Sequence, residues 1–279
     1  MRFGISTHLY HDRRLERAHC EQIRSFGFDA VELFATRSHL DYRDETAIAT
    51  LAQWLTETGL ALHSVHAPIT TSAAGGQWGD NYSNAAADAG RRQAAVAESG
   101  AALQIARRIP FNVLVVHLGC PSARSQAGDN ARASAFRSAE EICRLAEPLG
   151  VQVAFEVIPN ELSTAAALVA MLERDLDESH AGICLDFGHA HLLGDVADAV
   201  ETAAEHVITT HVHDNRGRDD EHLAPYRGSI NWDMALMTMQ KIGYEGAYMF
   251  ELATSATPAA SLEDARAARE RFERTLALP

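Results

Sequence analysis

Short apolar runs alternate with amphipathic stretches along the whole chain. Each run, such as LALHSVH, VLVVH, VQVAFE or HVITTH, is rich in β-branched residues and favours a buried strand. The stretch after each run repeats its apolar residues at helical spacing, and several of these stretches end close to a glycine. The predicted strands are Phe3–Ser6, Ala30–Phe34, Leu62–His66, Val113–His117, Val151–Glu156, Gly182–Asp186, Val207–His213 and Ala247–Glu251. The predicted helices are Arg13–Phe26, Glu45–Thr58, Asp88–Arg108, Arg132–Leu149, Thr164–Glu173, Val196–Glu205, Trp232–Ile242 and Leu262–Leu276.

Eight strand-then-helix units in 279 residues have the count and length of a (β/α)8 TIM barrel. The competing α/β fold is a doubly wound sheet, which usually has a glycine-rich first turn. The sequence contains neither GxGxxG nor a Walker A pattern, and no linker or low-complexity tract divides it. We therefore predict one TIM-barrel domain spanning residues 1–279.

Side chains that bind metals recur at or just after the ends of the predicted strands. Because the carboxyl ends of barrel strands meet at one mouth, these side chains are expected to converge. One histidine on a buried strand is usually an ordinary core residue, but core packing does not explain polar residues at the same end of strand after strand. The candidate metal ligands are His66, His117, Glu156, Asp186, His189, His211, Asp220, His222 and Glu251.

The candidate ligands form two chemical sets. Glu156, Asp186, His211 and Glu251 offer hard carboxylate oxygens and one imidazole, which suit Mn²⁺, Mg²⁺ or Co²⁺ and can also hold Zn²⁺. The other five candidates are richer in nitrogen, which favours zinc. They either hold further ions or form hydrogen bonds to the first metal's ligands and the substrate. The sequence thus predicts one to three divalent ions.

Three long connections follow predicted strands, at 67–87, 118–130 and 214–231. The first contains ITTSAAGGQWGDNYSN, and with Trp78 it is interpreted as a substrate lid or, equally, as a passive loop. His8 ends the first strand and is expected to reach the mouth. His191 and His213 each lie two residues beyond a candidate ligand, where a role in the site and exposure to solvent both remain open.

The bulk composition excludes several classes of function. A formal net charge of −14 disfavours nucleic acid as a partner, because such binding relies on cation–phosphate contacts. No apolar run approaches the roughly 20 residues that span a bilayer, which argues against a membrane protein. The first residues lack the apolar core of a signal peptide, so we expect a cytoplasmic protein. The four cysteines form no CxxC pair and are expected to be reduced.

Seven short motifs resemble the xylose-isomerase-like TIM-barrel superfamily, which includes sugar isomerases, ketose 3-epimerases, inosose dehydratases and type IV apurinic endonucleases. The resemblance covers nearly the whole chain and is specific for the fold and metal site but poor for the substrate. The motifs are HAP at 66–68, VVHLG at 115–119, FE at 155–156, CLDFGHA at 184–190, HVHDN at 211–215, DDEHL at 219–223 and FE at 250–251.

In the isomerase and epimerase branch, the resemblance implies one ion held by Glu156, Asp186, His211 and Glu251. The ion grips adjacent hydroxyl and carbonyl oxygens of a sugar, while one glutamate removes a proton from carbon and the other returns it through an enediolate. His189 then matches a substrate-binding histidine. An arginine usually follows the metal histidine by six residues in this branch. Glycine stands there in this chain, with Arg216 and Arg218 on either side, and Arg216 is taken as the candidate contact.

In the endonuclease branch, three zinc ions are held by nine ligands, and the resemblance matches each of them to a candidate ligand named above. Metal-bound hydroxide would attack a phosphodiester. The DNA-binding loop expected after HAP is replaced by ITTSAAGGQWGD.

We therefore predict a metal-dependent sugar or sugar phosphate isomerase or epimerase, with Glu156 and Glu251 as its catalytic pair and His8, Trp78, His189 and Arg216 as substrate contacts. A multinuclear zinc hydrolase of phosphoesters is the alternative, and a non-catalytic binding protein is disfavoured because no ligand is missing. A homodimer is the default expectation for its assembly.

Overall fold

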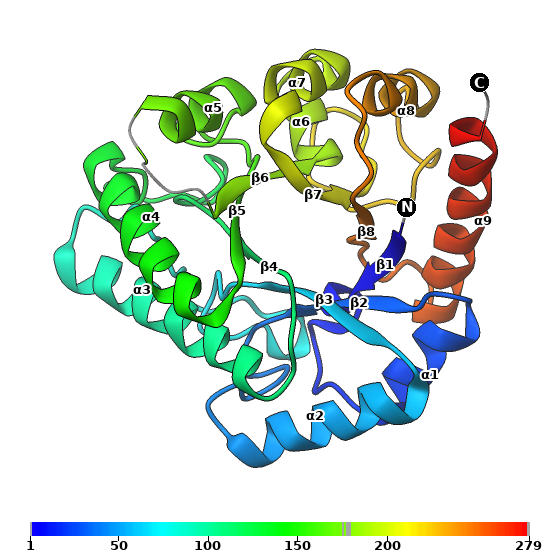
Figure 1. Ribbon diagram of the computed structural model, residues 1–279, viewed down its shortest axis with the longest axis horizontal. Helices are drawn as coiled ribbons and strands as arrows, with labels where there is room; N and C mark the ends of the chain where they lie inside the picture. Colours follow the sequence, from blue (N-terminus) through cyan, green and yellow to red (C-terminus); the bar gives the residue numbers. More distant parts are fainter. Residues whose placement is uncertain (1, 175, 177–179, 278–279) are drawn as a thin grey trace.

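Eight parallel strands pair in chain order and close on themselves where β1 pairs with β8, forming a barrel (Figure 1). The computed structural model describes residues 2–174, 176 and 180–277, and every element named below lies in these ranges. The closed barrel confirms the predicted (β/α)8 fold. The strands are β1 (Arg2–Ser6), β2 (Ala30–Phe34), β3 (Ala61–His66), β4 (Val113–Val116), β5 (Gln152–Glu156), β6 (Ala181–Asp186), β7 (Val207–Val212) and β8 (Ala247–Phe250).

Helices surround the barrel as an outer ring (Figure 1). Each predicted helix is present, α2 with the predicted bounds and the others with one or both ends shifted. One further helix, α6, was not predicted and follows directly on β6. The helices are α1 (Arg17–Ser25), α2 (Glu45–Thr58), α3 (Ala89–Leu103), α4 (Arg132–Ala146), α5 (Ala165–Arg174), α6 (Phe187–Leu193), α7 (Val196–Ala203), α8 (Trp232–Lys241) and α9 (Pro258–Leu276).

Capping explains where the ends differ from the prediction. Helix α9 begins at Pro258 rather than Leu262, because the Thr257 side chain accepts a hydrogen bond from the Ala260 amide and proline suits the first turn. Helix α1 begins only at Arg17, after Glu16 forms a capping box with His19. Gly59 ends α2 in the left-handed conformation (φ 70°), as its place after the amphipathic run predicts.

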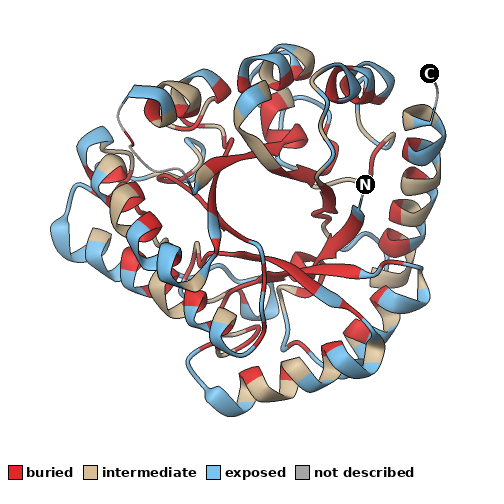
Figure 2. Cartoon of the chain, viewed as in Figure 1, coloured by how far each residue is buried: buried red, intermediate tan, exposed pale blue. Residues whose placement is uncertain are grey.

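Alternation along the strands separates the barrel interior from the layer beneath the helices. Val113, Val115, Ala154 and Cys184 form a small apolar cluster of their own inside the barrel. Their neighbours in the same strands, such as Leu114 and Phe155, belong to the large core that packs against the helices. The strands are buried almost along their full length (Figure 2).

The same alternation carries polar side chains to the inside at the carboxyl ends of the strands. Glu156 continues the inward row of Ala154, and Asp186 continues that of Cys184. The register pairs Asp186 of β6 with His211 of β7, so the two side chains lie next to each other. The floor of a polar site is thus set by strand register rather than by loop conformation.

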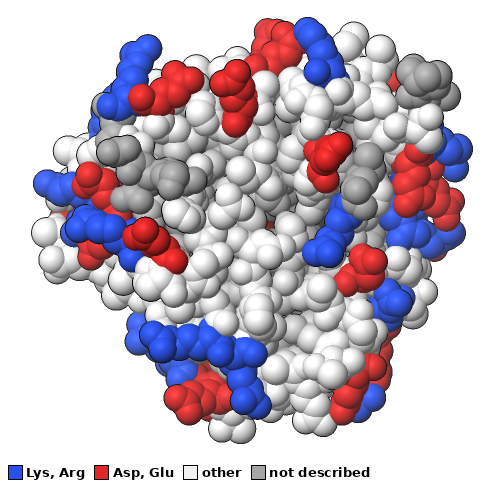
Figure 3. Space-filling view, in the orientation of Figure 1, with Lys and Arg blue, Asp and Glu red and all other residues white. Residues whose placement is uncertain are grey.

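The outer surface carries the charge of the chain. In the orientation of Figure 3, acidic and basic side chains gather around the edge of the molecule, while the middle of this face is largely uncharged. Among the described residues, no helix combines the length and apolar character needed to cross a membrane.

Candidate metal centre

A cavity of about 890 Å³ lies at the carboxyl ends of the strands. Six of the predicted ligands line it: His66, His117, His189, Asp220, His222 and Glu251. The other three, Glu156, Asp186 and His211, lie beneath it and are at most 1% exposed. The structure therefore brings all the predicted ligands to one site, with a buried floor and a cavity-lining wall.

The floor is formed by Glu156, Asp186, His211 and Glu251, whose ligand atoms all lie within 4.8 Å of one another. Nδ1 of His211 is 3.3 Å from a Glu156 oxygen, 3.7 Å from an Asp186 oxygen and 3.5 Å from a Glu251 oxygen. Three carboxylates this close repel one another in a buried site. A divalent cation would relieve that repulsion, and the oxygen-rich donor set suits it.

Two orphaned atoms also support a cation at the floor. Oε1 of Glu156 and Nδ1 of His211 are buried and form no hydrogen bond within the described part of the chain. Buried polar atoms are rarely left without partners, because their desolvation costs free energy. The two atoms lie 3.3 Å apart among the ligand atoms of the floor, where a metal ion would satisfy them.

A buried glutamate that sequence reasoning missed holds the histidine of the floor. A carboxylate oxygen of Glu32 on β2 lies 3.1 Å from Nε2 of His211, and Ser64 donates a 2.8 Å hydrogen bond to the same carboxylate. This contact directs Nδ1 of His211 to the other ligands. The sequence feature that could have revealed Glu32 is that it is the single acidic residue in AVELF, an otherwise apolar strand. Every residue of this strand is buried.

A second group joins His66, His117 and Glu156. Nδ1 of His66 donates a 2.9 Å hydrogen bond to the Ala67 carbonyl, which leaves Nε2 facing Glu156 at 3.2 Å. Nε2 of His117 lies 3.0 Å from the same Glu156 oxygen. Burial lowers the pKa of His117, so its ring is neutral and can act as a ligand. Burial alone would raise the pKa of Glu156, but His117 and His211 outweigh it and hold this pKa well below its usual range.

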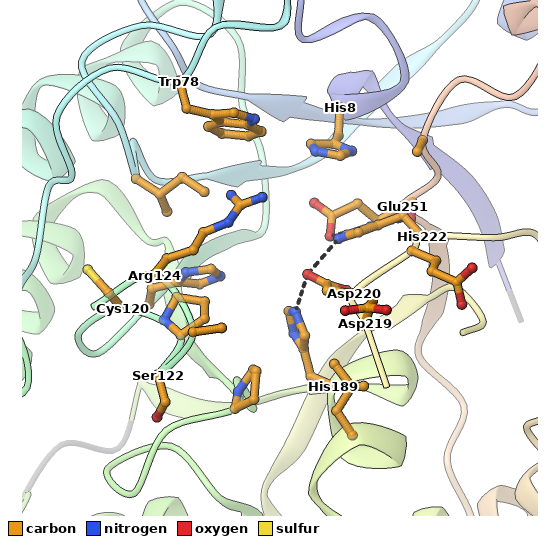
Figure 4. Close-up of a pocket in the computed structure, with 18 of the residues that line it drawn as sticks. His8, Trp78, Cys120, Ser122, Arg124, His189, Asp219, Asp220, His222 and Glu251 are labelled. Atoms are coloured by element: carbon orange, nitrogen blue, oxygen red, sulfur yellow. Dashed lines mark hydrogen bonds and ion pairs between the residues drawn. The ribbon is translucent and has the colours of Figure 1, made fainter. Parts of the chain in front are cut away.

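A third group contains His189, His213, Asp220 and His222. Oδ2 of Asp220 lies 3.2 Å from Nε2 of His189 and 3.3 Å from Nε2 of His222, as the dashed lines in Figure 4 mark. Nδ1 of His222 donates to the Glu251 carbonyl at 2.9 Å. Burial would lower the pKa of His222, but Asp220 outweighs it and raises this pKa to about 9.

Asp214 organises the loop that delivers Asp220 and His222. Its carboxylate accepts hydrogen bonds from the amides of Tyr226 and Ile230 and from Nε1 of Trp232. Its backbone pairs with Leu223 in an antiparallel bridge. His222 adopts φ 47°, an uncommon conformation for a residue other than glycine, and this bridge holds it there.

His213 is buried and supports Asp186 from behind. Its Nε2 lies 3.0 Å from Asp186 Oδ1, and its ring lies against Gly188. A Cβ at position 188 would stand 2.0 Å from Cε1 of His213, so glycine is required for this approach. The sequence left the role of His213 open, and the structure places it in the site. His191 instead bonds to Ser229 at 2.8 Å, on the exposed side.

Of the predicted substrate contacts, His8, Trp78 and His189 line the cavity, with His8 and Trp78 on one wall (Figure 4). Arg216 does not line it: its exposed guanidinium pairs with Glu221, because the backbone of this loop turns the side chain outward. Arg124 lines the cavity instead, with its guanidinium 5.0 Å from the centre of the Trp78 ring. Arg124 lies in the loop 118–130, whose conformation the sequence alone did not reveal.

Comparisons with known proteins agree with this architecture. An uncharacterized protein of Methanocaldococcus jannaschii is 28% identical over 258 residues, which cover 90% of this chain and 83% of that protein. The crystal structure of a D-tagatose 3-epimerase-like protein superposes with a TM-score of 0.79 at 27% identity, over 99% of this chain and 97% of that one. The crystal structure of IOLI protein with a bound zinc atom superposes over the full length of both chains, with a TM-score of 0.78 at 16% identity, and so supports the fold.

A family model described as the xylose isomerase-like TIM barrel matches residues 20–275. This range contains all the candidate metal ligands and the strands β2 to β8. The chain belongs to the xylose isomerase-like TIM-barrel family.

Proposed function

We propose that this protein is a metal-dependent isomerase or epimerase that moves a proton next to the carbonyl of a sugar. The proposal rests on the floor of the cavity. There Glu156, at the end of β5, and Glu251, directly after β8, both lie close to the imidazole of His211. The similarity to a D-tagatose 3-epimerase-like protein supports the same reaction class.

Glu156, Asp186, His211 and Glu251 would hold a divalent ion. When bound, that ion would polarise the carbonyl and make the neighbouring C–H bond more acidic. Glu32 keeps His211 oriented, and His213 keeps Asp186 in place. Their contacts fix the ligands before substrate arrives, which lowers the cost of reaching the reactive geometry.

The two glutamates have different access to a substrate. Glu251 lines the cavity, so its carboxylate can take a proton from a carbon atom above the floor. Glu156 lies beneath, with one oxygen held by His66 and His117 and the other 3.3 Å from Nδ1 of both His189 and His211. We assign proton transfer on one face of an enediolate to Glu251 and proton transfer on the opposite face to Glu156.

The test follows solvent deuterium into a ketose substrate on metal-loaded protein, with metal content determined on the same samples. Glu251→Gln keeps the shape and one oxygen donor but removes the base, so exchange is expected to fall by about 10²-fold or more. Glu98→Gln is the control, because Glu98 is buried on α3 and bonds to Arg43 at 2.8 Å, away from the cavity. Exchange at the wild-type rate in a metal-loaded Glu251→Gln protein would overturn the assignment.

A multinuclear zinc hydrolase is the second candidate, and one observation favours it. Among the described residues the candidate ligands form several overlapping groups, and Glu156 belongs both to the floor and to the group with His66 and His117. Replacing His222 discriminates between the candidates, because it lies outside the floor group and, unlike His117, does not hold the Glu156 carboxylate. A single-ion isomerase retains most of its exchange activity in His222→Asn, whereas a hydrolase of this type loses zinc and phosphoesterase activity together.

A further inference from the structure

We propose that the substrate carries an anionic group, a phosphate or a carboxylate, and that Arg124 binds this group. The inference rests on the proposed function and deepens it by naming the substrate class. Two arginines of the described residues line the cavity, Arg124 and Arg218. The inference rests on Arg124, because its guanidinium lies against the Trp78 ring.

Arg124 is exposed to solvent and lines the cavity. Its guanidinium lies 5.0 Å from the centre of the Trp78 ring, a distance at which the ring attracts a cation. Its backbone carbonyl accepts a hydrogen bond from Asn81, which belongs to the same loop as Trp78. Figure 4 shows the side chain directed across the cavity toward the wall formed by Glu251 and His222.

No carboxylate of the described residues pairs with Arg124, whereas some other exposed arginines of the chain are paired. Arg37 binds Asp41 and Arg227 binds Asp264 on the outer surface. Asp129, the acidic residue in the same loop as Arg124, is already paired with Arg91 at 2.8 Å. The guanidinium of Arg124 is therefore available to a ligand, and its planar fork suits a phosphate or carboxylate.

The charged side chains of the cavity place metal binding and anion binding at different ends. The carboxylates of Glu156, Asp186, Asp220 and Glu251 gather at the metal-binding end and would repel an anion there. Arg124 extends from the opposite wall, in the loop after β4. A substrate held by its anionic group at Arg124 would thus direct its uncharged carbonyl end toward the floor.

The cavity has the capacity for such a substrate. Its volume of about 890 Å³ falls within the range of pockets that bind small molecules. Both Arg124 and Trp78 lie in loops, which generally vary more among related proteins than the elements they connect and are therefore suited to set specificity.

The experiment compares metal-loaded wild-type protein with Arg124→Gln and Arg124→Lys. Deuterium exchange is measured with D-fructose, D-fructose 6-phosphate and D-fructuronate, and with the corresponding D-tagatose compounds. We expect Arg124→Gln to lower the ratio of kcat/KM for the anionic ketose over the neutral ketose by about ten-fold or more, through KM. Arg124→Lys should recover part of that ratio, and Arg107→Gln, on the outer surface, is the control.

The comparison between the phosphate and the carboxylate substrates identifies which anion is used. An unaltered ratio in Arg124→Gln, with exchange intact on neutral ketoses, would overturn the inference and leave the proposed function standing. The reverse case is an anion site in a protein that is not an isomerase. Calorimetric titration of the metal-loaded proteins with inorganic phosphate tests this case. Weaker phosphate binding in Arg124→Gln without exchange on any ketose would support the anion site and contradict the isomerase. Equal phosphate binding by both proteins would mean that the metal alone holds the anion, and would overturn the inference.

Discussion

The carboxylate of Glu32 lies 3.1 Å from Nε2 of His211, although the two residues belong to β2 and β7, which are not neighbours in the barrel. Both side chains are fully buried, so the contact crosses the barrel interior just beneath the floor of the cavity. A carboxylate behind a metal-binding imidazole fixes its tautomer and makes the ring a stronger ligand. Glu32 is therefore a positioning residue for the candidate metal centre.

Replacing Glu32 should weaken metal binding without removing a ligand. We expect Glu32→Gln to lower metal affinity by about 10- to 100-fold, as loss of such a supporting carboxylate usually does. Competition with a chelator of known affinity measures the effect. Glu98→Gln removes a buried carboxylate that supports no ligand and should leave metal affinity within about two-fold of wild type. If Glu32→Gln binds metal as tightly as wild type, the positioning role is wrong.

Removing the Asp214 carboxylate should release the loop that delivers Asp220 and His222. Its hydrogen bonds to the amides of Tyr226 and Ile230 would be lost in Asp214→Ala, and their donors would be left buried. We expect a loss of about 3 kcal/mol in the free energy of unfolding. Urea denaturation measures it, and elemental analysis should show fewer bound ions per chain. Unchanged stability together with an unchanged metal content would refute this role.

Adding a single methyl group at Gly188 should disturb the site from behind. The Cβ of an alanine would stand 2.0 Å from the His213 ring, so the ring must leave Asp186. Gly188→Ala is expected to cost about 1–3 kcal/mol of stability and to weaken metal binding. Gly100→Ala, in α3, is the matched control. A Cβ at this position meets only the exposed side chain of Leu145, at 3.3 Å. A variant at Gly188 that melts no lower than the one at Gly100 would contradict the packing argument.

The metal-free protein should lose stability as pH rises from about 6.5 to 9. Burial lowers the pKa of His222, but Asp220 outweighs it and raises this pKa to about 9, above the usual value near 6.5. A raised pKa adds stability that is fully present below 6.5 and disappears as pH rises through 9. Thermal melts of chelator-treated protein at pH 6 and pH 9.5 measure the difference.

His222→Gln should shrink that difference, since the titrating ring is gone. Metal affinity is expected to follow the opposite trend and to rise with pH, because protons compete with the ion for the imidazoles. A melting temperature that is the same at both pH values in the metal-free wild type would count against the His222–Asp220 pair.

The fold was predictable because its signals are local. Strand runs such as VQVAFE and the glycine stop at Gly59 are specified by neighbouring residues, and the closed barrel follows from their order. Helix α6 was not predicted, because its seven residues are too few for a periodic pattern and because its N-cap, Asp186, was interpreted only as a ligand.

Most of the candidate ligands could be predicted for the same reason, because they stand at the end of a strand or directly after it, whereas His189 lies on α6 and Asp220 and His222 lie on the loop after β7. Glu32 was missed although it shares the inward face of β2, because one glutamate within AVELF has no partner in the sequence nearby. The choice between Arg216 and Arg124 depended on loop conformation, which is set by contacts such as Asn81 with Arg124 and Glu221 with Arg216. Contacts of this kind join residues whose proximity no periodicity predicts.

The most direct test of the central claim is the rate at which deuterium from solvent enters the carbon beside the carbonyl of a ketose on metal-loaded protein. Wild type should catalyse exchange, and Glu251→Gln, with its metal retained, should lower the rate by about 10²-fold or more. Equal exchange by the two metal-loaded proteins, or no exchange by wild type on either neutral or anionic ketoses, would contradict proton transfer at this site.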